Sequence, residues 1–129
     1  MIGAMARVLV VDDNPVARNV AVAALESAGL VVDEASDGQE ALDCLEADPP
    51  DAVVLDIMMP RLSGHDVLAQ RRARHLAPDA AIVMLSCKSE DPDVTLAFEA
   101  GATDYLTKPF DPEDLVRSVR AALYQRRRR

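Results

Sequence analysis

Three short runs of apolar residues dominate the sequence, and each of them ends in a polar residue. They are RVLVVD (residues 7–12), AVVLD (52–56) and AAIVMLS (80–86). None shows the alternation of apolar and polar residues that marks a strand with one face in solvent. Strands covered on both faces occur in parallel sheets, so these runs predict a parallel sheet between two layers of helices.

Two weaker strand segments, residues 30–35 and 104–107, and five segments with helical spacing complete the pattern. Capping residues, prolines and glycines mark the ends of the predicted helices. The expected starts are Asn14-Pro15, Asp37 with Glu40 as a capping box, His65, Asp91-Pro92 and Asp111-Pro112, and the expected ends include Gly29, Pro49, His75 and Gly101. Strand and helix alternate five times, which predicts one α/β domain with right-handed crossovers and a doubly wound sheet.

Apolar residues at helical spacing suggest how the helices face the sheet. In the first helix these residues are Val16, Val20, Ala23, Ala24 and Ser27; we expect Ala41, Leu42 and Leu45 to face inward in the second, Val94, Ala97 and Phe98 in the fourth, and Leu115, Val119, Ala122 and Leu123 in the fifth. The third helix carries three arginines, Arg71, Arg72 and Arg74, in its last turn, where the helix dipole favours cations.

Composition narrows the class of protein. A chain of 129 residues with 50% hydrophobic residues fits one globular domain. No apolar run approaches the roughly 18 residues that cross a bilayer, and the first residues lack the features of a secretory signal, so we expect a cytoplasmic protein. The two cysteines, Cys44 and Cys87, have no metal-type spacing and are expected to stay reduced.

The net charge of −8 includes a run of four arginines, Arg126 to Arg129, so the rest of the chain is more acidic than the total suggests. An acidic body is repelled by phosphate backbones and is not expected to bind nucleic acid directly. The arginine run has three interpretations: a solvated helix end, the start of a linker, or a nucleic-acid-binding tail.

Chemistry is expected at the carboxyl ends of the strands, because ligands of such sheets bind there. Asp12 and Asp13 lie at the end of the first predicted strand, Asp56 ends the third and Ser86 ends the fourth. Lys108 follows the last predicted strand. Singly, each has a structural explanation as a capping, turn or surface residue. Together, three converging carboxylates would repel one another unless a hard cation such as Mg²⁺ bound them. Lys108 and Ser86 would then suit a phosphoryl group.

These residues lie within motifs that resemble the receiver domains of two-component response regulators. The matching segments are VLVVDDNP (8–15), DGQEAL (37–42), PPDAVVLDIMMPRLSGHDVL (49–68), residues 82–86 and AGATDYLTKPFDPEDL (100–115). The resemblance covers residues 7–124 and implies a flavodoxin-like sheet of five parallel strands in the order 2-1-3-4-5. It divides the chain into an extension (1–6), the receiver domain (7–125) and an arginine-rich tail or linker (126–129).

The resemblance also implies a role for each site residue. Asp56 would be the phosphoacceptor; Mg²⁺, with Mn²⁺ as an alternative, would be bound by Asp13, Asp56 and the Met58 carbonyl, and by Asp12 through water. Ser86, Lys108 and the backbone amides of Met59 and Cys87 would hold the phosphoryl oxygens, and Tyr105 would switch together with Ser86. The Lys108-Pro109 bond would be cis. Cys87 departs from the family pattern, which mostly has Ala or Gly at that position.

The implied function is a signalling switch that catalyses its own phosphorylation and slow autodephosphorylation, the latter tuned by Met58 and Lys88. The implied partners are a sensor histidine kinase or histidine phosphotransfer protein, a second copy of the phosphorylated chain, and an output domain or downstream protein, with no membrane partner. The switching surface would comprise the fourth helix, fifth strand and fifth helix.

Three other classes of protein fit these residues less well. A flavodoxin would need a phosphate-binding loop of Ser, Thr and Gly where this chain has Asp-Asp-Asn-Pro, and a haloacid-type phosphatase would need a second acid two residues after Asp56, where Met58 stands. A degenerate receiver acting as a non-phosphorylated interaction module should lack an acid or the lysine. The chain retains all of them.

Overall fold

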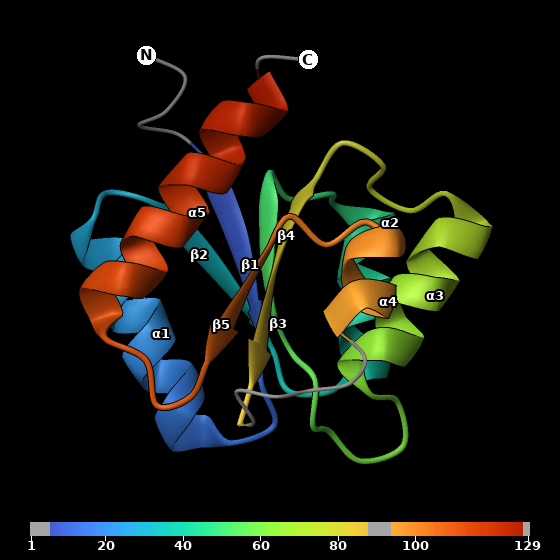
Figure 1. The fold of residues 1–129 in the computed structure, drawn as a ribbon, viewed down its shortest axis with the longest axis horizontal. Coiled ribbons are helices and arrows are strands. Elements are labelled where there is room, and N and C mark those ends of the chain that lie inside the picture. The colour runs from blue at the N-terminus through green and yellow to red at the C-terminus, as the bar shows by residue number, and fades with distance from the viewer. Residues whose placement is uncertain (1–5, 88–93, 128–129) are drawn as a thin grey trace.

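The computed structural model describes residues 6–87 and 94–127, and within these ranges five strands alternate with five helices (Figure 1). The strands are β1 (Arg7–Val11), β2 (Val31–Ala35), β3 (Ala52–Asp56), β4 (Ala81–Ser86) and β5 (Asp104–Thr107). The helices are α1 (Pro15–Ser27), α2 (Gly38–Ala47), α3 (Gly64–Arg74), α4 (Val94–Glu99) and α5 (Pro112–Arg127). Each strand ends within one residue of its predicted position. Among the described helices, none combines the length and apolar character needed to cross a bilayer.

All the strands run parallel, in the order β2-β1-β3-β4-β5. This confirms the flavodoxin-like order that the resemblance implied. In Figure 1, α1 and α5 cover the left face of the sheet, and α2, α3 and α4 cover the right face. The carboxyl ends of the strands meet at the lower edge of the molecule in this view, where the candidate site is expected.

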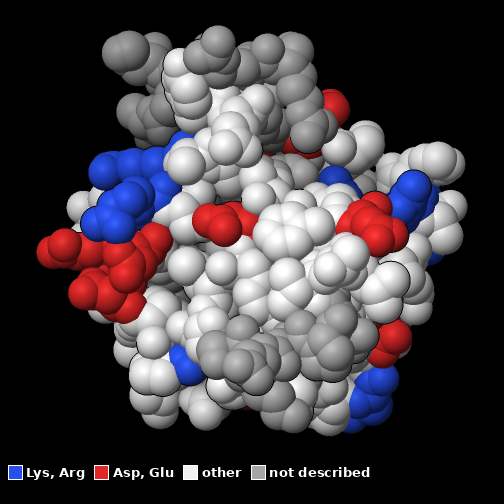
Figure 2. All heavy atoms as spheres, viewed as in Figure 1, with Lys and Arg blue, Asp and Glu red and all other residues white. Residues whose placement is uncertain are grey.

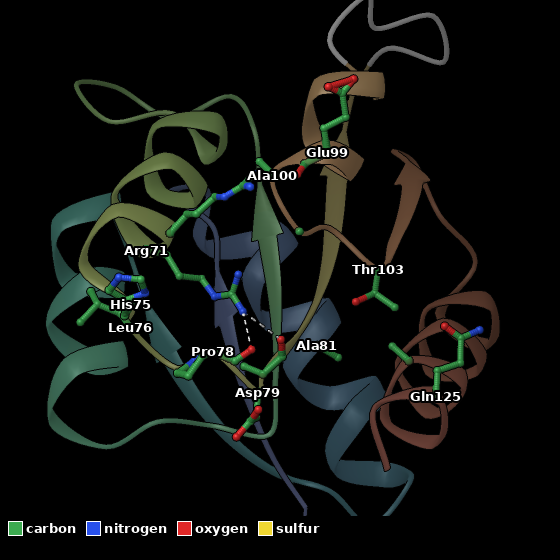
Figure 3. Close-up of a pocket in the computed structure, with 14 residues that line it drawn as sticks. Arg71, His75, Leu76, Pro78, Asp79, Ala81, Glu99, Ala100, Thr103 and Gln125 are labelled. Carbon is green, nitrogen blue, oxygen red and sulfur yellow. Dashed lines mark hydrogen bonds between the residues drawn. The ribbon is translucent and has the colours of Figure 1, made fainter. Parts of the chain in front are cut away.

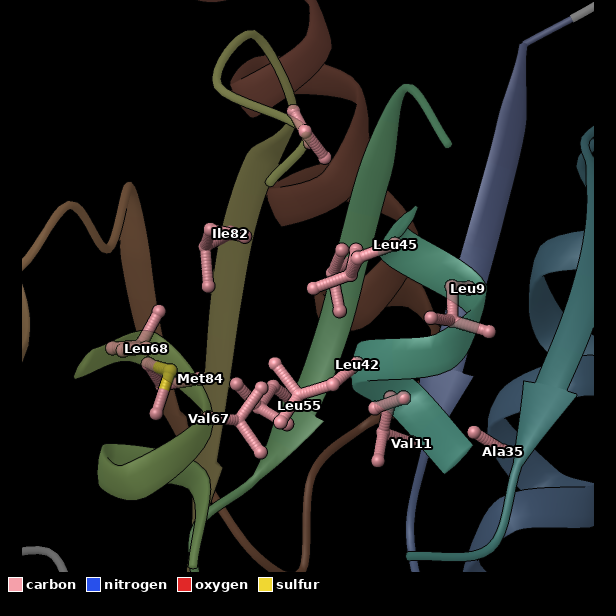
Figure 4. Packing of buried hydrophobic residues seen from close by; sticks show 14 of the residues in the cluster. Leu9, Val11, Ala35, Leu42, Leu45, Leu55, Val67, Leu68, Ile82 and Met84 are labelled. Atoms are coloured by element: carbon pink, nitrogen blue, oxygen red, sulfur yellow. The ribbon is translucent and has the colours of Figure 1, made fainter. Parts of the chain in front are cut away.

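The central strands are buried on both faces because helices cover both sides of the sheet. Successive residues of a strand point to opposite faces. Leu9 and Val11 therefore join the core beneath α2, α3 and α4, which Figure 4 shows, whereas Val8 and Val10 join the core beneath α1 and α5. This double burial explains why the strands are continuous apolar runs in the sequence.

The predicted inward faces of α2 and α5 are confirmed, but the spaced residues of α1 do not mark its buried face. Ala21 and Leu25 are the buried residues of α1, whereas Val16 is 71% exposed and Val20 is also exposed. The sequence of α1 is apolar around most of the helix, so spacing alone does not single out a face. The face of α1 that is buried is the one that packs against α5 and β2.

The short helix α4 also differs from the prediction. Ala97 is buried, but Phe98 is 43% exposed and Val94 only half-buried. A helix of six residues presents one narrow face to the sheet, and Ala97 occupies it. The predicted start at Asp91-Pro92 lies outside the described residues.

Hydrogen bonds at the helix ends bear out several predicted caps. The Asn14 side chain accepts hydrogen bonds from the first turn of α1, and the Asp37 side chain accepts one from the Glu40 amide at 2.8 Å. The Glu40 carboxylate accepts from the amide of Ser36 rather than Asp37, so only half of the predicted box forms. A complete box forms instead at α3, where the Ser63 and Asp66 side chains cap each other's amides, and α3 begins at Gly64, one residue before the predicted start.

Candidate functional site

The five polar residues expected at the sheet edge come from four different strands. Asp12 and Asp13 follow β1, Asp56 is the last residue of β3, Ser86 is the last residue of β4, and Lys108 follows β5. Because the strands are parallel, these residues share the lower edge in Figure 1. The fold thus brings together residues up to 96 positions apart in the sequence.

Three carboxylates are crowded at this edge. One oxygen from each of Asp12, Asp13 and Asp56 lies within 4.8 Å of the other two. Asp12 and Asp56 are buried, whereas Asp13 is exposed. The Asn14 amide donates a hydrogen bond of 2.9 Å to Asp12 Oδ1. The residue that caps α1 therefore also orients one acid of the cluster.

Lys108 supplies the positive charge of the cluster. Its Nζ lies 2.7 Å from Asp12 Oδ2 and 3.4 Å from Asp56 Oδ1. The backbone amide of Lys108 donates to the Ser86 carbonyl at 2.6 Å, and the Lys108-Pro109 bond is cis, as the resemblance implied. This turn directs the lysine from the edge strand toward the acids on the central strands.

Burial and crowding change the proton affinities of the cluster. Burial, followed by the charge of Asp12, raises the pKa of Asp56 to about 6, although Lys108 opposes the increase. Burial alone would lower the pKa of Lys108, but its hydrogen bond with Asp12 and the charges of Asp56 and Asp12 raise it overall. The lysine therefore stays protonated, while the phosphoacceptor candidate holds its proton more tightly than an ordinary aspartate.

The site fits a divalent cation with oxygen ligands. The Oδ1 atom of Asp56 is buried and accepts no hydrogen bond within the described residues. Three ionised carboxylates and one ammonium leave an excess of negative charge at neutral pH. Mg²⁺ prefers carboxylate and carbonyl oxygens together with waters, so it would satisfy both the unbonded oxygen and the excess charge.

The remaining predicted binding residues follow the ends of β3 and β4 in the chain. Ser86 is buried, and Cys87 follows it at the surface with a free thiol. Cys44, on α2, also has a free thiol and is half-buried. The Met59 amide donates to the Ile57 carbonyl at 3.1 Å, so it would have to leave that bond to hold a phosphoryl oxygen. Lys88 lies outside the described residues.

Tyr105 lies on the same face of the sheet as Ser86. In the parallel pairing of β4 and β5, Met84 is opposite Tyr105 and Ser86 is opposite Thr107. Since side chains two residues apart share a face, Ser86 and Tyr105 point to one side, on neighbouring strands. Tyr105 is half-buried and packs against the core beneath α2, α3 and α4. This placement suits a residue that responds to movement at Ser86.

Arg18 is a site residue that the sequence interpretation missed. Its Nη1 donates to the Asp12 carbonyl at 2.7 Å, and its Nε pairs with Glu34 at 3.0 Å. The arginine thus ties α1 and β2 to the backbone of the acid pair. A signal was available, because a cation near the amino end of a helix opposes the helix dipole and needs another reason to be there.

Gly64, the first residue of α3, is a second missed residue. A Cβ atom at this position would lie 2.6 Å from the Asp56 carbonyl oxygen. The Gly64 amide also donates to the Ile57 carbonyl at 2.9 Å. Glycine therefore lets the start of α3 approach the backbone of the phosphoacceptor candidate, and any side chain would push the two apart.

We expect Asp56→Asn to stabilise the metal-free protein near neutral pH by about 1 to 3 kcal/mol, because it removes a buried charge. The folded state binds the Asp56 proton more tightly than the unfolded state, so wild-type stability falls as pH rises from about 4 to about 6. The gain from the substitution should therefore be full above about pH 6 and vanish below about pH 4. Urea denaturation of both proteins in EDTA across this range measures it.

The matched control is Asp13→Asn, which removes an exposed acid of the same cluster and should give a smaller gain. An Asp56→Asn gain that is independent of pH would contradict the assignment of the raised pKa to Asp56.

We expect Arg18→Met to weaken binding of Mg²⁺ roughly tenfold, as losses of supporting contacts around metal ligands do. The direction of the change in Mg²⁺ affinity separates two effects. Removal of a positive charge would by itself strengthen cation binding, whereas loss of the contact with the Asp12 backbone would weaken it. Competition with Mn²⁺, followed by electron paramagnetic resonance, measures the affinity. Arg117→Met, which removes an exposed arginine paired with Asp114 on α5, should leave it unchanged. Equal or tighter binding by Arg18→Met would disprove the positioning role.

Comparison with known proteins agrees with the geometry of the site. The family model for the response regulator receiver domain matches residues 8–120. The response regulator MprA of Mycolicibacterium vanbaalenii is 44% identical over 117 residues, which are 91% of this chain and 50% of MprA. PhoP of Bacillus subtilis, an alkaline phosphatase synthesis transcriptional regulatory protein, is 43% identical over 117 residues, 91% of this chain and 48% of PhoP.

Among solved structures, the chemotaxis protein CheY4 of Vibrio cholerae superposes with a TM-score of 0.85 at 31% identity, covering 92% of this chain and 98% of CheY4. The chain spans about half the length of MprA and PhoP. The family match, the two relatives and the fold agree with the convergent acids and lysine, and the chain therefore belongs to the response regulator receiver domain family.

Proposed function

We propose that the chain takes a phosphoryl group from a histidine kinase or a histidine phosphotransfer protein onto Asp56. One observation carries the proposal: Asp56 Oδ1 is buried, accepts no hydrogen bond within the described residues, and lies 3.4 Å from Lys108 in a cluster of acids. A carboxylate in this setting is a nucleophile whose charge needs a cation before an anionic donor can approach.

The cation of this proposal is Mg²⁺, with Mn²⁺ as an alternative. Asp13, Asp56 and the Met58 carbonyl would bind it directly, and Asp12 would bind it through water. When bound, the ion would neutralise the phosphoryl oxygens and so lower the barrier to transfer. Lys108 would leave part of its contact with Asp12 to hold a phosphoryl oxygen as well.

In the transfer step an oxygen of Asp56 attacks phosphorus in line with the leaving nitrogen of the partner's phosphohistidine. The new O–P bond forms an acyl phosphate, and the P–N bond breaks with its electron pair returning to the imidazole ring. Lys108, Ser86 and the Met59 and Cys87 amides stabilise the equatorial oxygens. The chain's own residues thus catalyse its modification.

The signal is proposed to travel from Asp56 through Ser86 to Tyr105. Phosphorylation adds roughly two negative charges at Asp56, and a Ser86 hydroxyl turning toward them would free space on the face that Tyr105 shares. The surface that would change consists of α4, β5 and α5. Figure 2 shows this face with few charged residues at its centre, and Phe98 and Leu96 of α4 are both exposed.

A degenerate receiver that only binds partners is the alternative function. Such a domain would not need to keep Asp12, Asp13, Asp56 and Lys108 in one cluster. All four are present and close together here, which favours phosphorylation.

The surroundings of the domain are proposals too. MprA and PhoP are about twice the length of this chain. We therefore propose that the receiver domain (7–125) acts on an output domain of the same protein or on a separate downstream protein. The segments 1–6 and 126–129 would then be an extension and the beginning of a linker.

We predict that acetyl phosphate adds one phosphoryl group to the wild type in Mg²⁺ and none in EDTA, since the crowded carboxylates repel an anionic donor. Intact-mass spectrometry checks the number of groups added. Asp56→Ala should gain none, whereas Cys87→Ala, which alters a neighbouring surface side chain, should still gain one. Phosphorylation of Asp56→Ala, or an unmodified wild type, would refute the proposed function.

We predict that beryllofluoride, a phosphoryl mimic, changes amide chemical shifts across α4, β5 and α5 and promotes salt-sensitive self-association. Salt sensitivity follows because surface ion pairs contribute only about 0 to 1 kcal/mol each and are screened. Two-dimensional NMR and sedimentation at two salt concentrations test both parts. Shift changes limited to the site and to α1, α2 and α3 would rule out the proposed surface.

We predict slow dephosphorylation, over minutes to hours, because the Met58 side chain cannot orient an attacking water. It is 58% exposed beside the phosphoacceptor strand and offers only a weak acceptor. Met58→Asn should accelerate phosphoryl loss about tenfold, equivalent to about 1.4 kcal/mol of barrier. The half-life of the phosphorylated form, followed by mass spectrometry, measures this, with Val20→Asn on α1 as an exposed control. An unchanged half-life in Met58→Asn would disprove the proposal that Met58 slows dephosphorylation.

A further inference from the structure

A second polar pocket, of about 360 Å³, lies at the end of the domain opposite the acid cluster (Figure 3). The carboxyl-terminal parts of α3, α4 and α5 and the loop before β4 surround it. The proposed phosphoryl-transfer chemistry uses none of the residues that line it, and this inference does not rest on that function.

Arg71 of α3 is the unusual residue of this pocket. The sequence placed it among three arginines in the last turn of a helix, but it is only 8% exposed, and Figure 3 shows its guanidinium pointing inward. Its Nη2 donates to the carbonyls of Ala77, Pro78 and Ala80 at 3.0, 3.3 and 3.3 Å. The loop is shaped to reach it, since Ala77 adopts a positive φ of 43°.

These contacts use only one of the three guanidinium nitrogens as a hydrogen-bond donor. Nε is buried and donates no hydrogen bond, and the three bonds to the loop all use Nη2. Nη1 lies close to Gly101, where a Cβ atom would approach it to 3.2 Å, and none of the hydrogen bonds described for Arg71, which lines the pocket, uses Nη1. Within the described residues, no carboxylate lies within ion-pair distance of Arg71.

A buried cation without an anionic partner is costly, and burial lowers the pKa of Arg71. The hydrogen bonds to the loop carbonyls explain the use of Nη2, but they do not balance the positive charge of the guanidinium. An anion in the pocket would balance this charge.

The other lining residues indicate which kind of anion fits. Arg72 and His75 add donors, whereas Asp79 and Glu99 add negative charge. The carboxyl ends of helices also carry partial negative charge. A singly charged carboxylate can pair with Arg71 against this background, but a doubly charged phosphate meets stronger repulsion.

We propose that this pocket binds a small organic acid, whose carboxylate accepts hydrogen bonds from Arg71 Nη1. The ligand would complete the ion pair that the fold leaves open, and it would connect α3 to the turn after α4 at Gly101. The pocket is thus a second ligand site, distant from Asp56.

NMR titration of the full chain with acetate tests the proposal, with chloride at equal ionic strength as the salt control. We expect saturable shifts at the amides of residues 76–81 and 101–103 and at the Arg71 Nε–H group, with one common dissociation constant. Orthophosphate should bind more weakly. Arg71→Met should lose at least about tenfold in affinity, as expected for a charge-assisted hydrogen bond.

Arg74→Met is the matched control, since this arginine lies in the same helical turn but does not line the pocket. Shifts that do not saturate, shifts that persist in Arg71→Met, or tighter binding of orthophosphate at the same residues would each overturn the proposal. If Arg71→Met does not fold, the wild-type Arg71 Nε–H signal decides alone: a saturable shift supports the site, and an unmoved signal rejects it.

Discussion

Lys108 contacts two of the three crowded carboxylates, Asp12 at 2.7 Å and Asp56 at 3.4 Å, and so offsets part of their mutual repulsion. One ammonium does not balance three acids, so the cluster keeps an excess of negative charge. Burial of Asp56 makes the imbalance more costly, because charge is poorly solvated there. The proposed need for a divalent cation and the proposed response to phosphorylation both rest on this balance.

The parallel sheet makes the crowding possible. The acids follow β1 and end β3, the lysine follows the edge strand β5, and each strand stops at the same side of the sheet. Helices on both faces anchor these strands through two apolar cores, and Arg18 and Gly64 hold the surrounding backbone close to the acids. The stability of the cores offsets the electrostatic cost of the crowded acids, a balance common at functional sites.

The sequence predicted the features that depend on local pattern. Strand ends, most helix caps and the convergence of Asp12, Asp13, Asp56 and Lys108 could be inferred because period, capping chemistry and parallel topology are readable from residue order. The buried face of α1 could not, since its apolar residues surround the helix and packing with α5 selects one side. Arg71 was equally hidden, because an arginine at a helix end looks like a surface residue until the loop that folds over it is known.

The decisive measurement of the charge balance at Asp56 is the pKa of its carboxyl group, followed by NMR of the carbon-13 carboxyl signal with and without Mg²⁺. We expect a pKa of about 6 in EDTA, raised by burial and by Asp12. In Mg²⁺ the same carboxyl should titrate well below that value, because the cation stabilises the ionised form. A pKa near the ordinary 3.8 in EDTA, or a value that Mg²⁺ does not change, would contradict the account.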